Sequence, residues 1–553
     1  MARLVLGPLL RHVGEAEATI WVETDAPAQV EVLGHRARTF CVDGHHFALV
    51  VARDLRPGAS YEYEVRVDGE RAWPADDEPL PSPALRTLGG NRPLRIVFGS
   101  CRVSVPHEPP YVQDAPGREG GHGVDALRAL ALRLTRAGPQ ERPDLLLMLG
   151  DQVYADELSP HMREVVDRRG RAAGEPDDEL VDFEEYAAAY REAWSEPLVR
   201  WLLATVPTAM IFDDHEIHAE WKISAAWEAT MRDEPWFERR IAAGMAAYWV
   251  YQHLGNLPPA DLDDSELLAR VCAVDDGGAV LREVARDADR QPGHSRWSFC
   301  RDLGRTRLIV VDSRAGRVLQ PGRREMVDDG EWAWIEEHAT GDFEHLLLAS
   351  SVPFLLPHGL HGLERWNEAV CAGAWGPVAA RAGEWIRQAG VLDHWASFGR
   401  SFHRLAGLLE RIATGATGRP PVSVTMLSGD VHHCYLARVG FRRGLAPRSA
   451  VWQVVCSPYR KHLAPRERAI MRFGRSRPAR LLGRALARAV GTAPDPIGWR
   501  LVEEPSYDNQ LGTLTLGPDH AGVAVETTVD SDWREPSLRM AFEHDLLSRG
   551  PGA

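Results

Sequence analysis

Hydrophobic and polar positions alternate along the first 90 residues of the chain. The stretches "ATIWVET" (18–24), "HFALVVARDL" (46–55) and "YEYEVRVDG" (61–69) alternate apolar and polar side chains, and Gly, Pro and Asp residues separate them. Alternation with a period of two is typical of strands that bury one face. Residues 1–90 are therefore predicted to form a small all-β sandwich, which ends near the Gly- and Pro-containing segment 85–93.

From residue 94 onward the apolar positions form continuous runs instead. Six such runs occur, with helical stretches between them: "LRIVFGS", "DLLLMLGD", "TAMIFDDHE", "TRLIVVDSR", "HLLLASSVPF" and "VSVTMLSGDVHH". Continuous apolar runs are typical of strands that are buried on both faces, so residues 94–530 are predicted to form an α/β sandwich. The insertions 216–295 and 355–420 are predicted to be helical caps, and residues 509–530 to form a closing hairpin.

Composition and charge narrow the class of protein. The 553 residues are 44% hydrophobic, which is ordinary for a globular protein of two or more domains. The net charge of −15 argues against nucleic-acid binding through the whole surface. The seven cysteines are scattered, which argues against a disulfide scaffold or a zinc ribbon. No signal peptide and no apolar run of roughly 20 residues is recognisable, so we expect a soluble, cytoplasmic protein.

Several of the predicted strands end in residue types that bind metals. These residues are Cys101, Asp151 with Tyr154, Asp213 to His215, Asp312, and Asp430 with His432 and His433. In an open α/β sheet, ligands bind beyond the carboxyl ends of the strands. Each residue taken singly has a structural explanation, such as a buried cysteine, a helix N-cap or a solvated turn. Taken together they predict a metal site, because thiolate, carboxylate and imidazole groups gathered without a cation would repel or be desolvated at a cost.

These segments, in this order and spacing, resemble a known family. The motifs "GSCR", "GDQVYADE", "DDHE", "VDSR", "SSVPF" and "SGDVHH" resemble the PhoD-like (alkaline phosphatase D) branch of the calcineurin-like metallophosphoesterases, over roughly residues 94–437. "GDxxYAD" also resembles purple acid phosphatases. The resemblance implies a four-layer α/β/β/α sandwich, preceded by a small all-β domain of immunoglobulin or fibronectin III type.

The resemblance also implies an activity and a ligand set. The chain would be a phosphoric ester hydrolase that cleaves phosphate mono- or diesters by in-line attack of a metal-activated hydroxide at a dinuclear site. The implied metal ligands are Cys101, Tyr154 and His432 for Fe³⁺, Asp151 as the bridge, and Asp214 and Asp430 for the second metal. Hard oxygen ligands favour Ca²⁺ there, with Mn²⁺ or Mg²⁺ as alternatives, and the softer side also suits Zn²⁺. The "SSVPF" segment lacks the histidine that many metallophosphoesterases have, a gap shared with PhoD-like proteins.

Further residues are candidates for catalysis and substrate binding. His215, beside Asp214, is the candidate proton or hydrogen-bond donor. Arg102 is a candidate clamp for phosphate oxygens, and an ordinary salt bridge is an equally good interpretation. Arg314 is interpreted as tying its loop to Asp312. Four residues of the 355–420 insertion are candidate substrate-binding residues, with helical packing as the alternative for each: His358, His361, Trp395 and Arg400.

The segment 438–488 is strongly basic, with Glu467 as its only acid. Such a segment can bind a membrane surface or a polyanion such as nucleic acid. Because the whole chain is acidic, we favour docking against its own acidic stretches, such as residues 174–185. The expected partner is a small phosphoester substrate. Two alternatives stay open, a phosphodiesterase or nuclease acting on a polyanion and a non-catalytic binding protein that retains the fold. The natural substrate and the oligomeric state are left undetermined.

Overall fold

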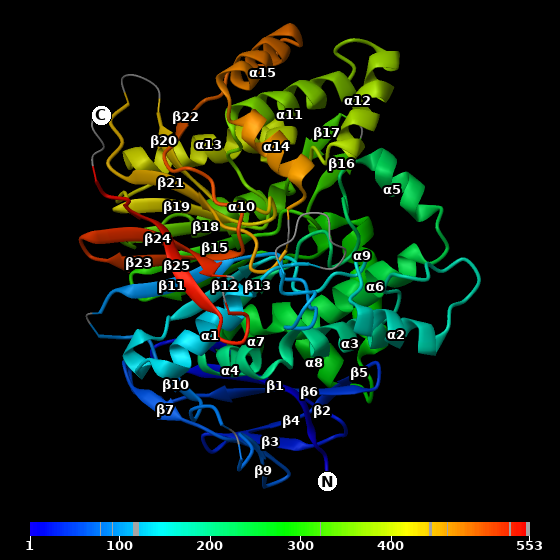
Figure 1. Cartoon of the computed structure of the whole chain (residues 1–553), viewed down its shortest axis with the longest axis vertical. Helices are drawn as coiled ribbons and strands as arrows, with labels where there is room; N and C mark the ends of the chain where they lie inside the picture. The colour runs from blue at the N-terminus through cyan, green and yellow to red at the C-terminus, as the bar shows by residue number, and fades with distance from the viewer. Residues whose placement is uncertain are drawn as a thin grey trace.

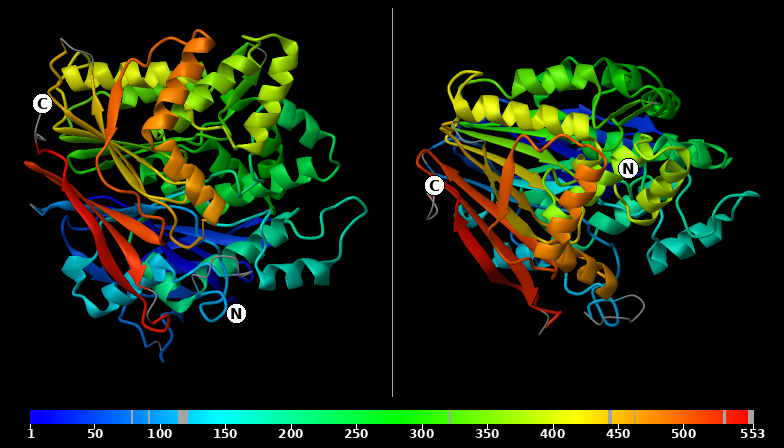
Figure 2. Two further views of the ribbon diagram at one scale, coloured as in Figure 1. Left: turned by 45° about the horizontal axis from the view of Figure 1, so that its top comes forward. Right: turned by 90° about the horizontal axis from the view of Figure 1, so that it is seen from above.

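Two central β-sheets lie against one another in the computed structural model (Figures 1 and 2), which describes residues 1–77, 79–90, 92–113, 121–320, 322–441, 445–461, 463–529 and 532–548. The first sheet has the strand order β13-β12-β11-β23-β24-β25. Its strands are β11 (Leu94–Gly99), β12 (Leu145–Leu149), β13 (Thr208–Ile211), β23 (Gln510–Gly517), β24 (His520–Val529) and β25 (Ser537–Asp545). The predicted closing hairpin corresponds to β23 and β24, which pair antiparallel.

The second sheet has the strand order β14-β15-β18-β19-β21-β20-β22. Its strands are β14 (Phe299–Leu303), β15 (Thr306–Val311), β18 (His345–Ser350), β19 (Ser423–Ser428), β20 (Tyr435–Gly440), β21 (Ala450–Val455) and β22 (Gly498–Leu501). In the first sheet β11, β12 and β13 are parallel, and in the second β15, β18, β19 and β21 are parallel. The carboxyl ends of each parallel set therefore meet at one edge of the sheet.

Successive residues of one strand enter different cores, which explains the continuous apolar runs. Leu308 and Val310 of β15 pack with the first sheet, whereas Ile309 and Val311 pack with the helices on the outer face. Those helices are α10 (Asp329–His338) and α13 (Gly399–Thr414). On the other side, α1 (Ala126–Arg136), α3 (Phe183–Trp194), α4 (Pro197–Thr205) and α6 (Phe237–Tyr248) belong to the core of the first sheet. The expected α/β/β/α layers are confirmed.

The N-terminal region is all-β, as expected. One sheet contains β1 (Leu4–Val13), β2 (Ala18–Thr24), β6 (His45–Ala52) and β5 (Phe40–Val42), and the other contains β4 (His35–Arg38), β3 (Gln29–Val32), β8 (Val65–Val67) and β9 (Glu70–Trp73). Ile20 and Val30 belong to the core between these sheets. Trp21 and Phe47 face the other way, with ring centroids 5.3 Å and 5.4 Å from Tyr251. The first of these sheets is thus buried on both faces.

The two predicted insertions are helical and take different positions. Residues 216–295 include α5 (Ala225–Arg232), α6, α7 (Pro259–Asp263), α8 (Glu266–Cys272) and α9 (Gly278–Arg290). They pack beside β13, α3 and the N-terminal β5. Residues 355–420 include α11 (His358–Cys371), α12 (Pro377–Ala389) and α13. Figure 1 shows α11 and α12 at the end of the molecule opposite the N-terminal sheets, together with α14 (Pro465–Gly474) and α15 (Arg477–Ala489).

None of the helices within the described ranges combines the length and the apolar character that crossing a bilayer requires.

The buried contact between the N-terminal sheet and the rest of the chain gives a test of stability. Phe47→Ala removes a fully buried ring that contacts Trp21 and Tyr251. We expect the free energy of unfolding to fall by about 3–5 kcal/mol, because a cavity replaces the ring. The matched control is Phe473→Ala, which truncates an exposed phenylalanine and is expected to cost less than about 0.5 kcal/mol. Chemical denaturation measures both, and equal costs would contradict the described interface.

Candidate metal centre

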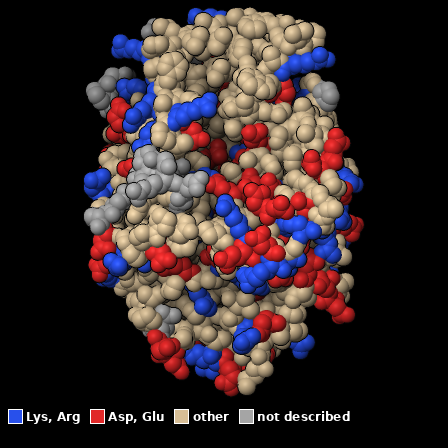
Figure 3. All heavy atoms as spheres, turned by 45° about the vertical axis from the view of Figure 1, so that its right-hand side comes forward, with Lys and Arg blue, Asp and Glu red and all other residues tan. Residues whose placement is uncertain are grey.

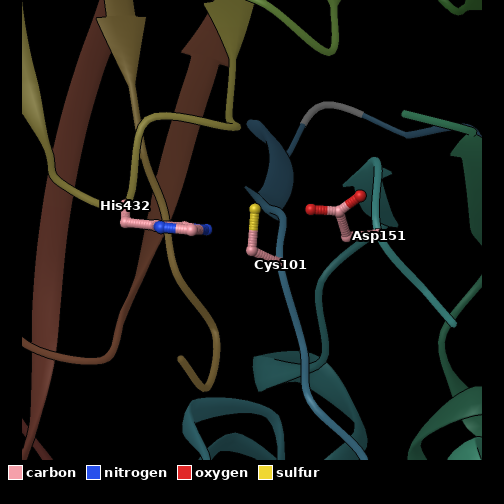
Figure 4. Close-up of side chains that lie close together, drawn as sticks. All are labelled: Cys101, Asp151 and His432. Carbon is pink, nitrogen blue, oxygen red and sulfur yellow. The ribbon is translucent and has the colours of Figure 1, made fainter. Parts of the chain in front are cut away.

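Side chains from three separate strand ends meet at the edge where the parallel strands finish. Cys101 follows β11, Asp151 follows β12 and His432 follows β19, and one ligand atom from each lies within 4.8 Å of the others. Figure 4 shows the Cys101 thiol between the His432 imidazole and the Asp151 carboxylate, with these groups pointing toward one another. A thiol, a carboxylate and an imidazole in this arrangement are suitable ligands for one metal ion.

A second set of carboxylates lies directly beside this group. A ligand atom of Asp151 also lies within 4.8 Å of Asp214 and His215, and Asp214 forms a further group with Asp213 and Asp430. Residues 213–215 come after β13, so four strand ends contribute to the whole cluster. Because Asp151 belongs to two of the groups, its carboxylate is positioned to contact two cations at once.

The backbone is strained at four of the predicted ligands. The φ angles of Cys101, Asp151, Asp430 and His432 are 57°, 53°, 64° and 48°. In a residue that carries a Cβ atom, this left-handed conformation costs about 1–2 kcal/mol. Strain of this kind persists where the surrounding structure demands it, and it is concentrated at functional sites. The three strand ends that carry these residues therefore adopt an unfavourable backbone conformation, which directs the four side chains into one volume.

Buried carboxylate oxygens in the cluster lack hydrogen-bond partners. Within the described residues, Oδ1 of Asp151 and Oδ2 of Asp213 are buried and accept no hydrogen bond. Burial raises the pKa of Asp151 to about 6, and His215 opposes this shift while Asp214 adds to it. An unsatisfied buried acceptor costs about 1–3 kcal/mol, and more if it is charged. A cation beside these oxygens would remove that cost, so the carboxylates fit a metal ion.

The thiol and the phenol of the cluster also require a cation in order to ionise. Burial raises the pKa of Cys101 well above its usual value, and Asp151 and Asp430 raise it further. The Tyr154 hydroxyl donates a hydrogen bond of 3.2 Å to Asp151, and burial together with Asp151 raises the pKa of Tyr154 well above its usual value. A bound metal ion reverses this preference by stabilising thiolate and phenolate ligands. The full predicted donor set is therefore consistent with a metal site.

His215 is held in place by a carboxylate outside the cluster. Its Nδ1 lies 2.8 Å from Asp156, and its ring centroid lies 4.7 Å from that of Tyr154. Burial and Lys461 lower the pKa of His215, but Asp156 and Asp214 raise it to about 10. The imidazole is therefore positioned beside the carboxylates with a proton available.

Arg314 is a fully buried cation close to several of the carboxylates. The sequence did not reveal this role. Its backbone N–H does bond Asp312, as expected, but its guanidinium forms ion pairs with Asp213 and Asp393. It also lies 3.5 Å from Asp214 and 3.7 Å from Asp430. A fully buried arginine here offsets part of the repulsion among these acids. No local sequence pattern indicates this role, since the partners come from three other segments.

Two solved structures have a similar fold. The structure of PhoD matches with a TM-score of 0.56 and 13% sequence identity, covering 97% of this chain and 88% of that chain. The structure of purple acid phosphatase PPD1 from yellow lupin (Lupinus luteus) seeds matches with a TM-score of 0.50 and 11% identity, covering 97% of this chain and 73% of that chain. No curated protein sequence matches the chain.

Two family models match parts of the sequence. A domain of unknown function (DUF7800) matches residues 1–85. A PhoD-like phosphatase model matches residues 129–266, which contain Asp151, Tyr154 and Asp214. Residues 129–266 are therefore similar to PhoD-like phosphatases. The resemblance inferred from the motifs is therefore confirmed, and so is the fold class.

Arg102 is not directed at the cluster of the PhoD-like domain. Its Nε and Nη2 each lie 2.8 Å from Oδ2 of Asp125, and its Nη1 donates to the backbone carbonyl of Ala193. The guanidinium is thus held by a buried ion pair with Asp125, the N-cap of α1, and by a hydrogen bond to Ala193. The structure favours the salt bridge over the predicted phosphate clamp, because all three guanidinium nitrogens have partners away from the cluster.

The four candidate substrate-binding residues make other contacts. His361 and His358 pack on Trp499, with ring centroids 4.6 Å apart in both cases. Trp395 is buried against Trp332 and Phe354 in the core outside the second sheet. Arg400 is mostly exposed and pairs with Glu325. Among the described residues, none of the four contacts a predicted metal ligand, so the packing interpretation is the one that the structure favours.

The residue next to Trp395 reaches the cluster instead. Nε2 of His394 lies 3.3 Å from the Asp430 carboxylate, and its Nδ1 lies 2.7 Å from Glu364 of α11. A second cation lies beside Tyr154, where Nζ of Lys461 is 4.0 Å from the ring centroid and 2.7 Å from Glu157. The sequence contains one possible signal for each of these two residues. His394 follows an aspartate, Asp393, and Lys461 is one of only two lysines in the chain.

Gly150 allows the turn that carries Asp151, and its replacement gives a sharp test. Its φ is 110°, and a Cβ atom there would lie 2.6 Å from the Cβ of Asp213. We expect Gly150→Ala to lower the free energy of unfolding by more than about 2 kcal/mol and to reduce bound metal. Gly34→Ala is the matched control, since its φ is 80° and nothing lies within 4 Å. It should show only the conformational cost of about 1 kcal/mol. Equal losses in both variants would contradict the described close approach.

Removing the Arg314 guanidinium should leave several buried carboxylates uncompensated. Arg314→Gln is expected to lower the free energy of unfolding by about 3–5 kcal/mol, as breaking a buried ion pair does. Arg400→Gln is the control, because the Arg400 side chain is 68% exposed and its partner Glu325 also pairs with Arg323, and we expect a change below about 1 kcal/mol. Chemical denaturation in the presence of a chelator measures the protein contribution alone. A change below 1 kcal/mol in Arg314→Gln would show that the network is not stabilising.

Proposed function

We propose that this protein is a metal-dependent phosphoesterase with a dinuclear site at the shared edge of the two sheets. The observation that carries the proposal is the position of Asp151, whose carboxylate belongs both to the Cys101 and His432 group and to the Asp214 group and has an unsatisfied buried oxygen. The PhoD-like family match and the folds of PhoD and purple acid phosphatase support the same activity.

The donor chemistry suggests which metal occupies each side. Cys101, Tyr154 and His432 offer a thiolate, a phenolate and an imidazole, and we propose Fe³⁺ for this side, with Zn²⁺ as the alternative. Asp214 and Asp430 offer only carboxylate oxygens, and we propose Ca²⁺, with Mn²⁺ or Mg²⁺ as alternatives. Asp151 would contact both ions. Bound metals would supply positive charge for the phosphate oxygens and make water a stronger acid.

The protein's own residues would orient the substrate and handle a proton. With Nδ1 of His215 held by Asp156, its second ring nitrogen, Nε2, is the one available to donate a proton to the leaving oxygen. The Lys461 ammonium lies beside Tyr154 and is suited to bind phosphate oxygens. The His394 imidazole lies between Glu364 and Asp430, so it would position the Asp430 carboxylate. Arg314 is occupied by carboxylates, so it positions Asp213 and its neighbours instead of contacting the substrate.

These groups indicate a phosphate ester as the class of substrate. We propose a small phosphoester as the substrate, either a monoester or a diester. Turnover of p-nitrophenyl phosphate compared with bis-p-nitrophenyl phosphate by the same metal-loaded preparation distinguishes the two. Hydrolysis of neither ester, in a protein that does bind two metals, would favour the non-catalytic alternative.

Metal analysis of the purified protein is the direct test of the site. We expect two metal ions per chain and, if iron is present, a visible absorption band from thiolate or phenolate ligands. Removal of the metals with a chelator should abolish phosphoesterase activity, and readdition should restore it. A protein without metal that gains no activity when metals are added would contradict the proposal.

Asp151→Asn tests the bridging residue itself. The substitution keeps the shape of the side chain and removes its negative charge, so we expect loss of at least one metal ion and a decrease of activity by about 10³-fold or more. Asp342→Asn is the matched control, because Asp342 is exposed and pairs only with Arg419 on the surface. Wild-type metal content in Asp151→Asn, measured by elemental analysis, would remove Asp151 from the site.

A further inference from the structure

Exposed apolar side chains are concentrated at one end of the molecule. Of the twelve large hydrophobic residues that are exposed in the described part of the chain, eight lie within residues 375–391 and 470–482. They are Trp375, Val378, Trp385, Val391, Ile470, Phe473, Leu481 and Leu482. Trp385 is 72% exposed and Leu481 is 64% exposed, which is unusual for residues of this size. We call α12, α14 and α15 with these side chains the cap surface.

The same surface carries unpaired positive charge. Residues 465–489 contain eight arginines, seven in α14 and α15 and Arg475 between the two helices, and the one acid, Glu467, accepts a hydrogen bond from the backbone N–H of Ala464. Among the described residues, none of these arginines has a carboxylate within 4.0 Å; Arg475 bonds a backbone carbonyl, and Arg468 and Arg472 lie over the Tyr507 ring. Figure 3 shows this end of one face largely uncharged with Lys and Arg around it, whereas most Asp and Glu lie lower.

The expected docking of this basic segment against residues 174–185 is wrong. The carboxylates of that acidic stretch have other partners: Glu175 pairs with Arg239, Glu179 with Arg240, and Glu185 with Arg171. Residues 442–444 and 462 of the basic segment lie outside the described residues. Several acids of this stretch are therefore paired locally, and no ion pair joins it to the described arginines of α14 and α15.

The packing of α15 holds its leucines outward. Small residues of α15 face α11, where a Cβ atom on Gly362 would lie 2.7 Å from Cα of Gly483. Likewise, a Cβ atom on Gly359 would lie 2.7 Å from Cβ of Ala479. Backbones this close fix the rotation of α15 about its axis, so Leu481 and Leu482 on the other side of the helix cannot turn into the core. Their exposure is a consequence of the helix contact.

We propose that the cap surface docks the protein on an anionic lipid bilayer. Exposed Trp, Phe and Leu side chains interleaved with arginines are suited to the membrane interface, where the rings enter the headgroup region and the guanidinium groups bind lipid phosphate. A nucleic acid or an acidic protein would use the arginines and leave Phe473, Leu481 and Trp385 without a role. A second copy of the chain would bring eight arginines against eight of the same sign. The bilayer is the partner that satisfies both features.

The rest of the molecule defines the orientation. The chain has a net charge of −15, although the cap surface is basic, so an anionic membrane repels the remaining surface and attracts this end. The cap surface also adjoins the metal centre, because the Tyr507 ring beneath Arg468 and Arg472 lies 5.6 Å from His433, the neighbour of His432. Docking would therefore bring the site close to the lipid headgroups. The proposal concerns binding and does not rest on the proposed activity.

Sedimentation of the full-length protein with vesicles tests the proposal. We expect binding to phosphatidylcholine vesicles that contain about 30% phosphatidylglycerol to exceed binding to pure phosphatidylcholine by about tenfold or more, and to weaken as salt is added. Equal binding to both vesicles, or binding to neither, would overturn the proposal.

Paired variants identify the surface that binds. R477Q/R484Q and F473S/L481S should each lower anionic vesicle binding by about fivefold or more, since both features contribute. The matched controls are R36Q/R419Q and V274S/M540S, which remove exposed side chains elsewhere and should change binding by less than about twofold. If only the arginine pair matters, and single-stranded DNA competes with the vesicles, the partner is a polyanion and the membrane proposal is wrong. A concentration-dependent dimer lost in F473S/L481S would equally contradict it.

Discussion

Negative charge collected at the shared edge of the two sheets is the constraint on which the rest of the structure depends. Strands β11, β12 and β13 of one sheet and β19 of the other end there. The segments that follow them bring together Asp151, Asp213 and Asp214, which are buried, and Asp430, which is partly buried. Carboxylates a few ångströms apart in a poorly solvated volume cannot all remain ionised without opposite charge. Much of the neighbouring structure supplies that charge, and the proposed metals complete it.

The compensating groups come from segments that are far apart in the sequence. Arg314 follows a strand of the second sheet, His394 precedes a short turn in the helical insertion, and Lys461 follows β21. Each is fixed by a further contact of its own, such as the pairing of Arg314 and Arg317 with Asp393. The site is therefore complete only when both sheets and the insertion have assembled. The left-handed backbone of Cys101, Asp151, Asp430 and His432 is tolerated because this surrounding network holds it.

The elements outside the two central sheets fall into two groups: the N-terminal sandwich, which supports the core, and the cap surface, which is exposed to solvent. The N-terminal sandwich packs on the α/β domain through buried aromatic rings, with Trp21 and Phe47 against Tyr251. It is therefore a rigidly attached support for that domain. At the opposite end, close glycine contacts between α11 and α15 use small residues for packing and leave arginine and leucine on the surface. The molecule is acidic over most of its surface, and it is basic with exposed apolar side chains at the cap surface. This difference follows from the packing of α15 on α11 through small residues.

The sequence alone was sufficient to predict the main secondary-structure elements and the types of side chain that follow the strands. Alternation in residues 1–90 and continuous apolar runs afterwards are local properties, and they predicted the β-sandwich and an α/β core because burial on one or both faces determines them. The four-layer arrangement was implied only by the resemblance of the motifs to PhoD-like metallophosphoesterases. Cys101, Asp151, Asp214, Asp430 and His432 could be named because each directly follows a predicted strand. Tertiary structure decided where charged side chains point. Arg102 pairs with Asp125, the N-cap of α1, His394 and not Trp395 reaches the cluster, and the arginines of α15 form no ion pair with a carboxylate in the described part of the chain. Such pairings depend on which distant segments pack together, and no local pattern in the chain encodes that.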